Sequence, residues 1–78
     1  MDQLFYIAED LGMVKGSDYE VKLNGLVASF TFNDKQKAKS LHEAFNHAYS
    51  VGDINIFFIT EVRPSSLGNK YSFKISLQ

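Results

Sequence analysis

Two histidines are the residues of this sequence that are most readily suited to catalysis or to metal binding. His42 and His47 are five positions apart, which is about 140° around a helix, so they do not share a helical face. Glu43 and His47 are one helical turn apart, but two ligands without a third make a weak metal site. We therefore interpret both histidines as solvated polar residues, and we expect no metal ion and no cofactor.

Sequence motifs of known catalytic chemistry are also lacking. No serine lies in a nucleophile elbow of the G-x-S-x-G type. The five glycines do not have the spacing of a phosphate-binding loop. We therefore expect no catalytic residues, although a small enzyme or a subunit whose site has no recognisable motif stays open as an alternative.

A cluster of three lysines, Lys35, Lys37 and Lys39, could bind an anion. They fall in the first turns of an expected helix, where cations oppose the helix dipole. Glu9 and Asp10 are equally unfavourable at the end of the preceding helix. We expect these acidic residues to face Lys35 or Lys39 across the surface, as weak exposed ion pairs. The alternative is a site for nucleic acid or another acidic ligand at the lysine cluster.

Composition limits the remaining function classes. The 78 residues are enough for one domain, 1–78. A net charge of −1 argues against a strongly electrostatic nucleic-acid binder. The absence of cysteine excludes disulfides and thiolate metal sites and fits the cytoplasm. No apolar run approaches the roughly 20 residues of a membrane span, so we expect no membrane partner.

The clearest structural signal is a β-hairpin over residues 19–32. Asn24-Gly25 is a favoured pair for a two-residue turn that needs positive φ at both positions. That turn pairs Leu23 with Leu26, Val21 with Ala28 and Tyr19 with Phe30. Because side chains alternate along a strand, these six residues share one apolar face, and the opposite face is mostly polar.

Amphipathic helices are expected on either side of this hairpin. Residues 2–11 have apolar side chains at helical spacing and are followed by Gly12. Residues 35–51 have a stripe of alanines, Leu41 and Phe45, with an N-cap from Asn33-Asp34 and a terminating Gly52.

A second pair of strands is expected over residues 54–63, ended by Pro64, and 71–77, with a loop at 64–70 between them. The resulting αββαββ order predicts an α+β fold, with both helices on one face of a four-stranded antiparallel sheet. Two strand orders keep all neighbours antiparallel. The order 1-2-4-3 is a circularly permuted ferredoxin-like arrangement, and 2-1-3-4 is the other; the sequence leaves both open.

The strand over 54–63 is apolar on both of its faces. Ile56 and Phe58 point one way, and Phe57 and Ile59 point the other. We assign Ile56 and Phe58 to the core, because that choice keeps the charged Glu61 and Arg63 outside it. The corresponding register places Ile56, Phe58, Thr60 and Val62 opposite Leu77, Ile75, Phe73 and Tyr71.

This assignment leaves Phe57 and Ile59 on the open sheet face, beside Val27. Contiguous exposed apolar groups commonly mark an interface. The sequence therefore predicts a non-enzymatic protein-binding domain, an inhibitor or regulator that acts through its apolar sheet face at Val27, Phe57 and Ile59. The partner is another protein, with a second copy in a homodimer included, and nucleic acid is the less favoured partner.

Overall fold

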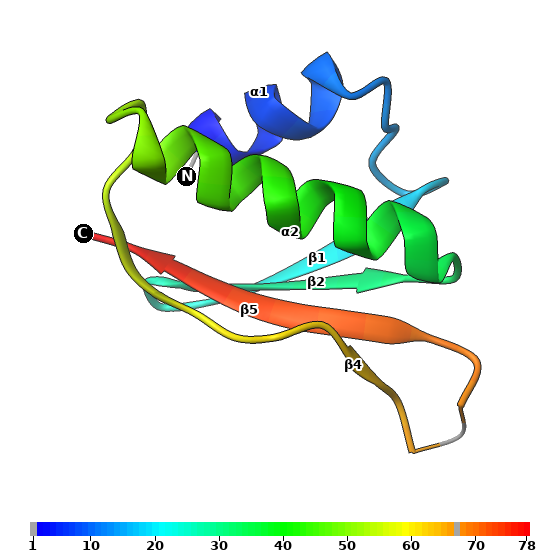
Figure 1. The fold of residues 1–78 in the computed structure, drawn as a ribbon. Helices are drawn as coiled ribbons and strands as arrows, with labels where there is room; N and C mark the ends of the chain where they lie inside the picture. The colour runs from blue at the N-terminus through cyan, green and yellow to red at the C-terminus, as the bar shows by residue number, and fades with distance from the viewer. Residues whose placement is uncertain (1, 67) are drawn as a thin grey trace.

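The computed structural model describes residues 2–66 and 68–78 and has two layers, a pair of helices above an antiparallel sheet (Figure 1). The fold class is α+β, as predicted. The elements in chain order are α1 (Asp2–Asp10), β1 (Tyr19–Asn24), β2 (Val27–Phe32), α2 (Lys35–Ser50), β3 (Ile56–Ile59), β4 (Arg63–Pro64) and β5 (Tyr71–Leu77).

The sheet has five strands, where four were predicted. Its order is β1-β2-β5-β3, with β4 also paired to β5, and these strand pairs are antiparallel. The extra strand arises because the segment predicted as one strand over 54–63 is interrupted after β3, and β4 includes Pro64, which was wrongly predicted to end the strand. The ferredoxin-like comparison stays a prediction. The loop predicted over 64–70 includes Leu67, which lies outside the described residues.

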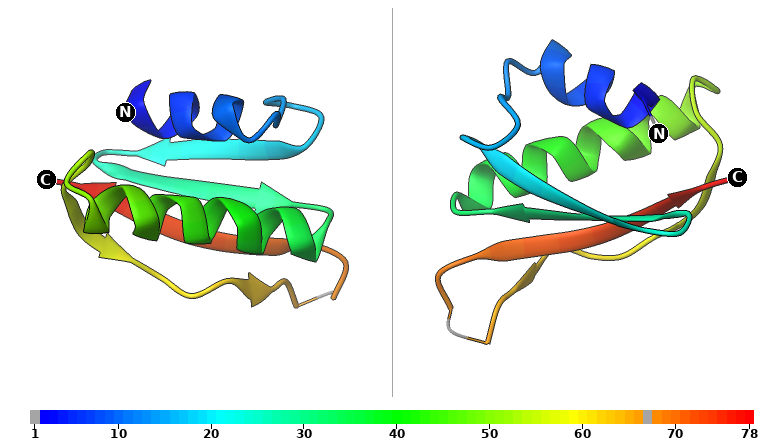
Figure 2. Two further views of the ribbon diagram at one scale, coloured as in Figure 1. Left: turned by 45° about the horizontal axis from the view of Figure 1, so that its top comes forward. Right: turned by 180° about the vertical axis from the view of Figure 1, so that it is seen from behind.

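Both helices lie on the same side of the sheet and run in opposite directions (Figures 1 and 2). The other side, which we call the outer face, has no helix over it. This arrangement brings the connector after α1 to the same end of the molecule as the start of α2. It also divides every strand into a core-facing and an outer-facing set of side chains.

The core lies between the sheet and the apolar faces of the two helices, which the sequence predicts. Leu41 and Phe45 of α2 are fully buried, and the Phe45 ring lies 5.4 Å from that of Phe30. Phe30 also stacks on Phe73 with 5.6 Å between ring centroids. The fully buried large side chains are Phe30, Phe32, Phe45, Phe73, Leu4, Leu41 and Ile75. The helix that contributes Phe45 begins as predicted, at an Asp34 cap that accepts from the Gln36 N–H at 2.8 Å.

The first hairpin forms, but its predicted turn is wrong by one residue. The turn residues are Gly25 and Leu26, because Asn24 pairs with Val27. Gly25 has φ of 62°, and Leu26 has no positive φ. Glycine at the first central position is typical of a type II′ turn, which needs a positive φ only there. Leu26 is consequently 74% exposed and does not belong to the apolar face.

The predicted division between the two faces of this hairpin nevertheless holds. Tyr19 pairs with Phe32 rather than with Phe30. Moving the turn by one residue shifts the pairing by two, and a shift of two returns every side chain to its original face. The alternation of apolar residues therefore could not distinguish the two turns.

The predicted register of the second hairpin is wrong beyond its first pair. Ile56 lies opposite Leu77 as expected, but Phe58 lies opposite Ser76 and Ile59 opposite Ile75. Phe57 is thus an extra residue, a β-bulge. A further shift follows before β4, where Arg63 pairs with Ser72 and Pro64 with Tyr71.

Candidate interaction surface

The bulge decides which side chains of β3 enter the core. Ile59 lies opposite Ile75, which is fully buried under the helices, and Ile59 packs against the core. Its predicted place on the open face is therefore wrong. Ile56, opposite Leu77, packs against the core as predicted. A regular strand would put Ile56 and Ile59 on opposite faces, and the extra residue between them brings both to the same face.

The two phenylalanines between these isoleucines remain exposed. Phe57 is 69% exposed and Phe58 is 37% exposed, so the predicted core position of Phe58 is wrong. Their ring centroids are 6.1 Å apart, with 66° between the ring planes. Phe58 lies opposite Ser76, whose neighbours along β5, Ile75 and Leu77, pack in or against the core under the helices. The Phe58 side chain therefore projects on the outer face.

Val27 lies in the same cross-strand row as Phe58, whereas the predicted interface grouped it with Phe57 and Ile59. Ser76 pairs with Val27 on one side and with Phe58 on the other. Ser76 is only 4% exposed, and its hydroxyl donates to the Leu26 carbonyl at 2.9 Å. This hydrogen bond fixes the hairpin turn at the end of the row. We call Leu26, Val27, Phe57 and Phe58 the apolar corner; Leu26 and Phe58 were missed by sequence reasoning, because their exposure depends on the turn and the bulge.

The next two rows of the outer face are basic. In the first, Lys22 pairs with Ser29, and Ser29 pairs with Lys74. The row ends at Thr60, whose hydroxyl accepts from the Lys74 N–H at 2.8 Å. In the second, Glu20, Thr31, Ser72 and Arg63 pair in succession across the sheet. We call these the basic rows, because their exposed charged side chains are Lys22, Lys74, Arg63 and a single anion, Glu20.

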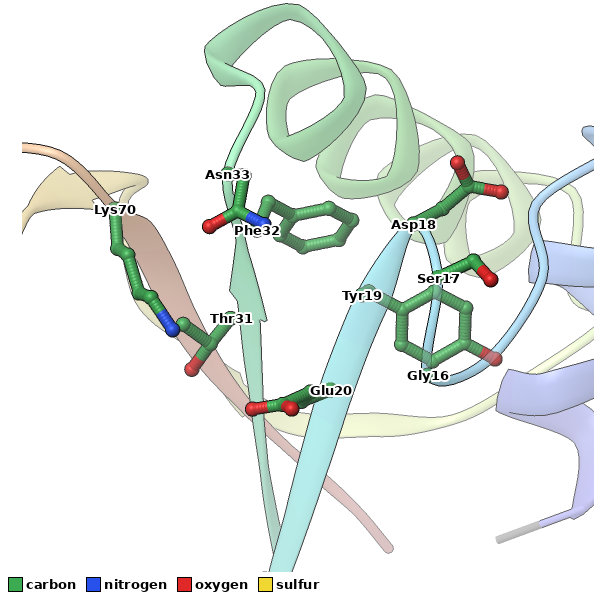
Figure 3. Close-up of a pocket in the computed structure, with 9 residues that line it drawn as sticks. All are labelled: Gly16, Ser17, Asp18, Tyr19, Glu20, Thr31, Phe32, Asn33 and Lys70. Atoms are coloured by element: carbon green, nitrogen blue, oxygen red, sulfur yellow. The ribbon is translucent and has the colours of Figure 1, made fainter.

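A small polar hollow lies at the end of the sheet beside the second basic row (Figure 3). Lys70 and Thr31 lie on one side of it and Glu20 on another, as Figure 3 shows. Its volume is about 50 Å³, which is room for a water or two. The residues that line it are Gly16, Ser17, Asp18, Tyr19, Glu20, Thr31, Phe32, Asn33 and Lys70. The hollow is too small to accept a ligand of substrate size.

The predicted lysine cluster is partly neutralised by a residue that the sequence did not indicate. Lys37 Nζ lies 2.6 Å from Asp18 Oδ1. The other Asp18 oxygen accepts from the Val14 N–H at 2.6 Å. The hydrogen bond from Lys37, followed by that from Val14, lowers the pKa of Asp18 below its ordinary value. The same hydrogen bond to Asp18 raises the pKa of Lys37.

This ion pair replaces the predicted partners of the cluster. Within residues 2–66 and 68–78, neither Glu9 nor Asp10 forms an ion pair with Lys35 or Lys39. The connector after α1, rather than α1 itself, reaches the start of α2 and supplies the anion (Figure 2). The sequence could have suggested Asp18 as the partner of the lysine cluster, because Asp18 is the last residue of that connector, immediately before β1.

His42 is a structural residue rather than a solvated one. It is half-buried, and its ring lies edge-on to Phe73 with 5.2 Å between centroids. Nε2 donates to the Thr60 carbonyl at 3.0 Å, and Nδ1 lies 3.2 Å from the Asn46 amide nitrogen. The hydrogen bond to Thr60 links α2 to the segment between β3 and β4. His47 is exposed, and in the described part of the chain no three His, Asp or Glu side chains gather in a metal-binding arrangement.

A second hollow, which is apolar, lies between α1, the connector and the start of β1. It has a volume of about 480 Å³ and is lined by Phe5, Glu9, Met13, Val14, Lys15 and Tyr19. The Lys15 ammonium lies 5.2 Å from the centre of the Phe5 ring, which gives this hollow a charged rim. This hollow is the alternative to the apolar corner as a candidate interaction surface.

Comparison of the chain with models of known protein families, with curated proteins and with solved structures finds no match. Among residues 2–66 and 68–78, no helix has both the length and the apolar character needed to cross a membrane. The function therefore has to be inferred from the residues of this chain alone.

Proposed function

We propose that the protein is a small non-enzymatic binding domain, a regulator or inhibitor that acts by occupying a surface of another protein. It binds through the apolar corner, Leu26, Val27, Phe57 and Phe58. The absence of cysteine fits a partner and a site of action in the cytoplasm.

The exposure of two adjacent phenylalanines is the observation that supports this proposal most strongly. The ring of Phe57 lies 6.1 Å from that of Phe58, which projects on the helix-free side of the sheet, and both side chains are exposed. The β-bulge at Phe57 produces this exposure, and bulges commonly redirect side chains at functional positions. Exposed aromatic side chains that cluster are also the usual centres of protein interfaces.

The apolar corner provides only part of the binding free energy that a stable complex needs. With Phe57 69% and Phe58 37% exposed, a partner would remove about 200 Å² of phenylalanine surface from water. At about 25 cal/mol per Å², that burial contributes about 5 kcal/mol. Association itself opposes binding by about 4–15 kcal/mol. The partner must therefore contact further parts of the outer face.

The lysine cluster supports the alternative function less well. Lys37 already has Asp18 as a partner 2.6 Å away, which leaves Lys35 and Lys39 to attract a ligand. Asp34 lies in the same turn, where its carboxylate caps α2. We therefore do not propose an anion site at the start of α2.

The test compares two exposed aromatic residues on opposite sides of the molecule. Tagged wild-type protein, Phe57→Ser and Tyr6→Ser are used to capture partners from the native host, and captured proteins are quantified by mass spectrometry. Tyr6 is a matched control because it is 62% exposed, on α1. The proposal predicts a partner that Phe57→Ser loses, with at least a tenfold rise in Kd for the purified pair. Retention by Phe57→Ser together with loss by Tyr6→Ser would place the interface on the helices.

A further inference from the structure

The charge of this protein is unevenly distributed, although its total is close to zero. The chain has eight basic and nine acidic residues. In the described part of the chain, Glu20 is the one acidic residue at an outer-facing strand position, whereas Lys22, Lys74 and Arg63 share that face. Lys70 adds a further cation at the rim of the hollow beside Thr31 (Figure 3). The outer face is therefore basic, and the net charge of −1 conceals it.

The basic rows lie at regular distances from the apolar corner. Val27 and Phe58 occupy one row, Lys22 and Lys74 the next, and Arg63 the third. Neighbouring rows are two residues apart along the strands, which is about 7 Å. An extended peptide has the same spacing between side chains that point the same way. One segment lying along β5 could thus contact all three rows with alternate residues.

We propose that the partner presents an extended acidic segment to the outer face. A large apolar side chain binds at the apolar corner. The second residue along carries a carboxylate to Lys22 and Lys74, and the fourth carries one to Arg63. This inference rests on the proposed function and specifies the chemistry of the partner at the same surface.

Charge complementarity selects this occupant over a second copy of the chain. Two outer faces brought together would oppose Lys22, Lys74 and Arg63 to one another, and like-charge contacts at an interface are strongly unfavourable. An acidic segment instead meets three cations and the hydroxyls of Ser29 and Thr31. The same charges also accelerate association, an effect that added salt weakens.

The aromatic geometry favours a protein segment over a nucleic acid. Single-stranded nucleic acids stack successive bases on aromatic rings. The planes of Phe57 and Phe58 differ by 66°, so they form no parallel platform for neighbouring bases. Leu26 and Val27 complete the corner with aliphatic surface, which suits an apolar side chain of a protein.

The test uses two symmetric peptides of identical composition. The first, Glu-Ser-Glu-Ser-Phe-Ser-Glu-Ser-Glu, places carboxylates two and four residues from the phenylalanine in either direction. The second, Ser-Glu-Ser-Glu-Phe-Glu-Ser-Glu-Ser, places them one and three residues away, on the opposite side of an extended chain. Binding to the full chain is followed at low ionic strength by amide chemical shifts. We expect the first peptide to bind at least fivefold more tightly, with shifts at Ser29, Phe58 and Lys74.

Two variants that change the net charge by the same amount show whether the electrostatic contribution to peptide binding comes from the outer face. Lys74→Glu, on the outer face, should weaken the first peptide at least fivefold, whereas Lys35→Glu, at the start of α2, should leave its Kd within a factor of two. Circular dichroism of both variants establishes that they are folded. Equal effects of the two variants would mean that only net charge matters and would overturn the proposal.

The remaining outcomes separate this inference from the proposed function. Equal affinities of the two peptides would overturn the acidic segment, even if Phe57→Ser loses the captured partner and the proposed function stands. Tighter binding of an oligothymidine than of the first peptide would assign the basic rows to nucleic acid. Dimerisation of the free chain in light scattering, abolished by Phe57→Ser, would assign the surface to a second copy.

Discussion

Replacement of Ile59 and of Phe57 by alanine tests the bulge that creates the candidate surface. Ile59 packs against the core beside Ile75, whereas Phe57 is 69% exposed. Truncation of a buried isoleucine costs about 2–5 kcal/mol. Since Ile59 is half-buried, we expect Ile59→Ala to lower the free energy of unfolding by about 1–3 kcal/mol. Phe57→Ala should change it by less than about 0.5 kcal/mol, although it removes the larger side chain.

Urea denaturation measures the difference directly. A domain of this size has an m-value of about 1 kcal/mol per M, so Ile59→Ala should shift the midpoint by about 1–3 M. The midpoint of Phe57→Ala should stay within about 0.5 M of the wild type. A midpoint of Ile59→Ala as close to the wild type as that of Phe57→Ala would restore the regular strand predicted from alternation, which puts both residues on the open face. The outward position of Phe58 would then be lost as well.

Two further changes test local parts of the fold. Gly25→Val should destabilise the protein by about 1 kcal/mol or more, because valine resists the φ of 62° that Gly25 adopts. No neighbouring atom would clash with the added side chain, so the backbone conformation alone is tested. An unchanged thermal midpoint would rule out the type II′ turn. Asp18→Asn should destabilise the protein at neutral pH. Because the folded pKa of Asp18 lies below its ordinary 3.8, its contribution is complete above that value and is lost as the pH falls through the folded pKa. A stability difference between wild type and Asp18→Asn that persisted unchanged in strong acid would contradict this role.

The sequence predicted the helices and the sorting of faces well, because both depend on periodicity. The Leu41 and Phe45 stripe of α2 is buried as expected, and the Asp34 cap lies at the predicted start. The position of the first turn was not predicted correctly. Turns at Asn24-Gly25 and at Gly25-Leu26 produce the same faces, so only backbone geometry distinguishes them.

The candidate site was predicted less completely, since it depends on an irregularity. Alternation could place either Phe57 or Phe58 outward, but not both, and it could not bring Ile56 and Ile59 into the core together. An inserted residue does both, and no residue type in Ile-Phe-Phe-Ile marks a bulge. The Asp18–Lys37 pair is a further tertiary contact that local sequence patterns do not specify, because it joins residues 19 positions apart.

NMR cross-saturation from an unlabelled partner to the methyl groups of this protein tests most directly whether the apolar corner is the interface. Irradiation of the partner in the captured complex attenuates only those methyl groups that contact it. We predict attenuation at Leu26 and Val27, with Met13 and Val14 of the apolar hollow beside α1 unaffected. Attenuation of Met13 and Val14 with Leu26 and Val27 unaffected would contradict the account and assign binding to the hollow beside α1.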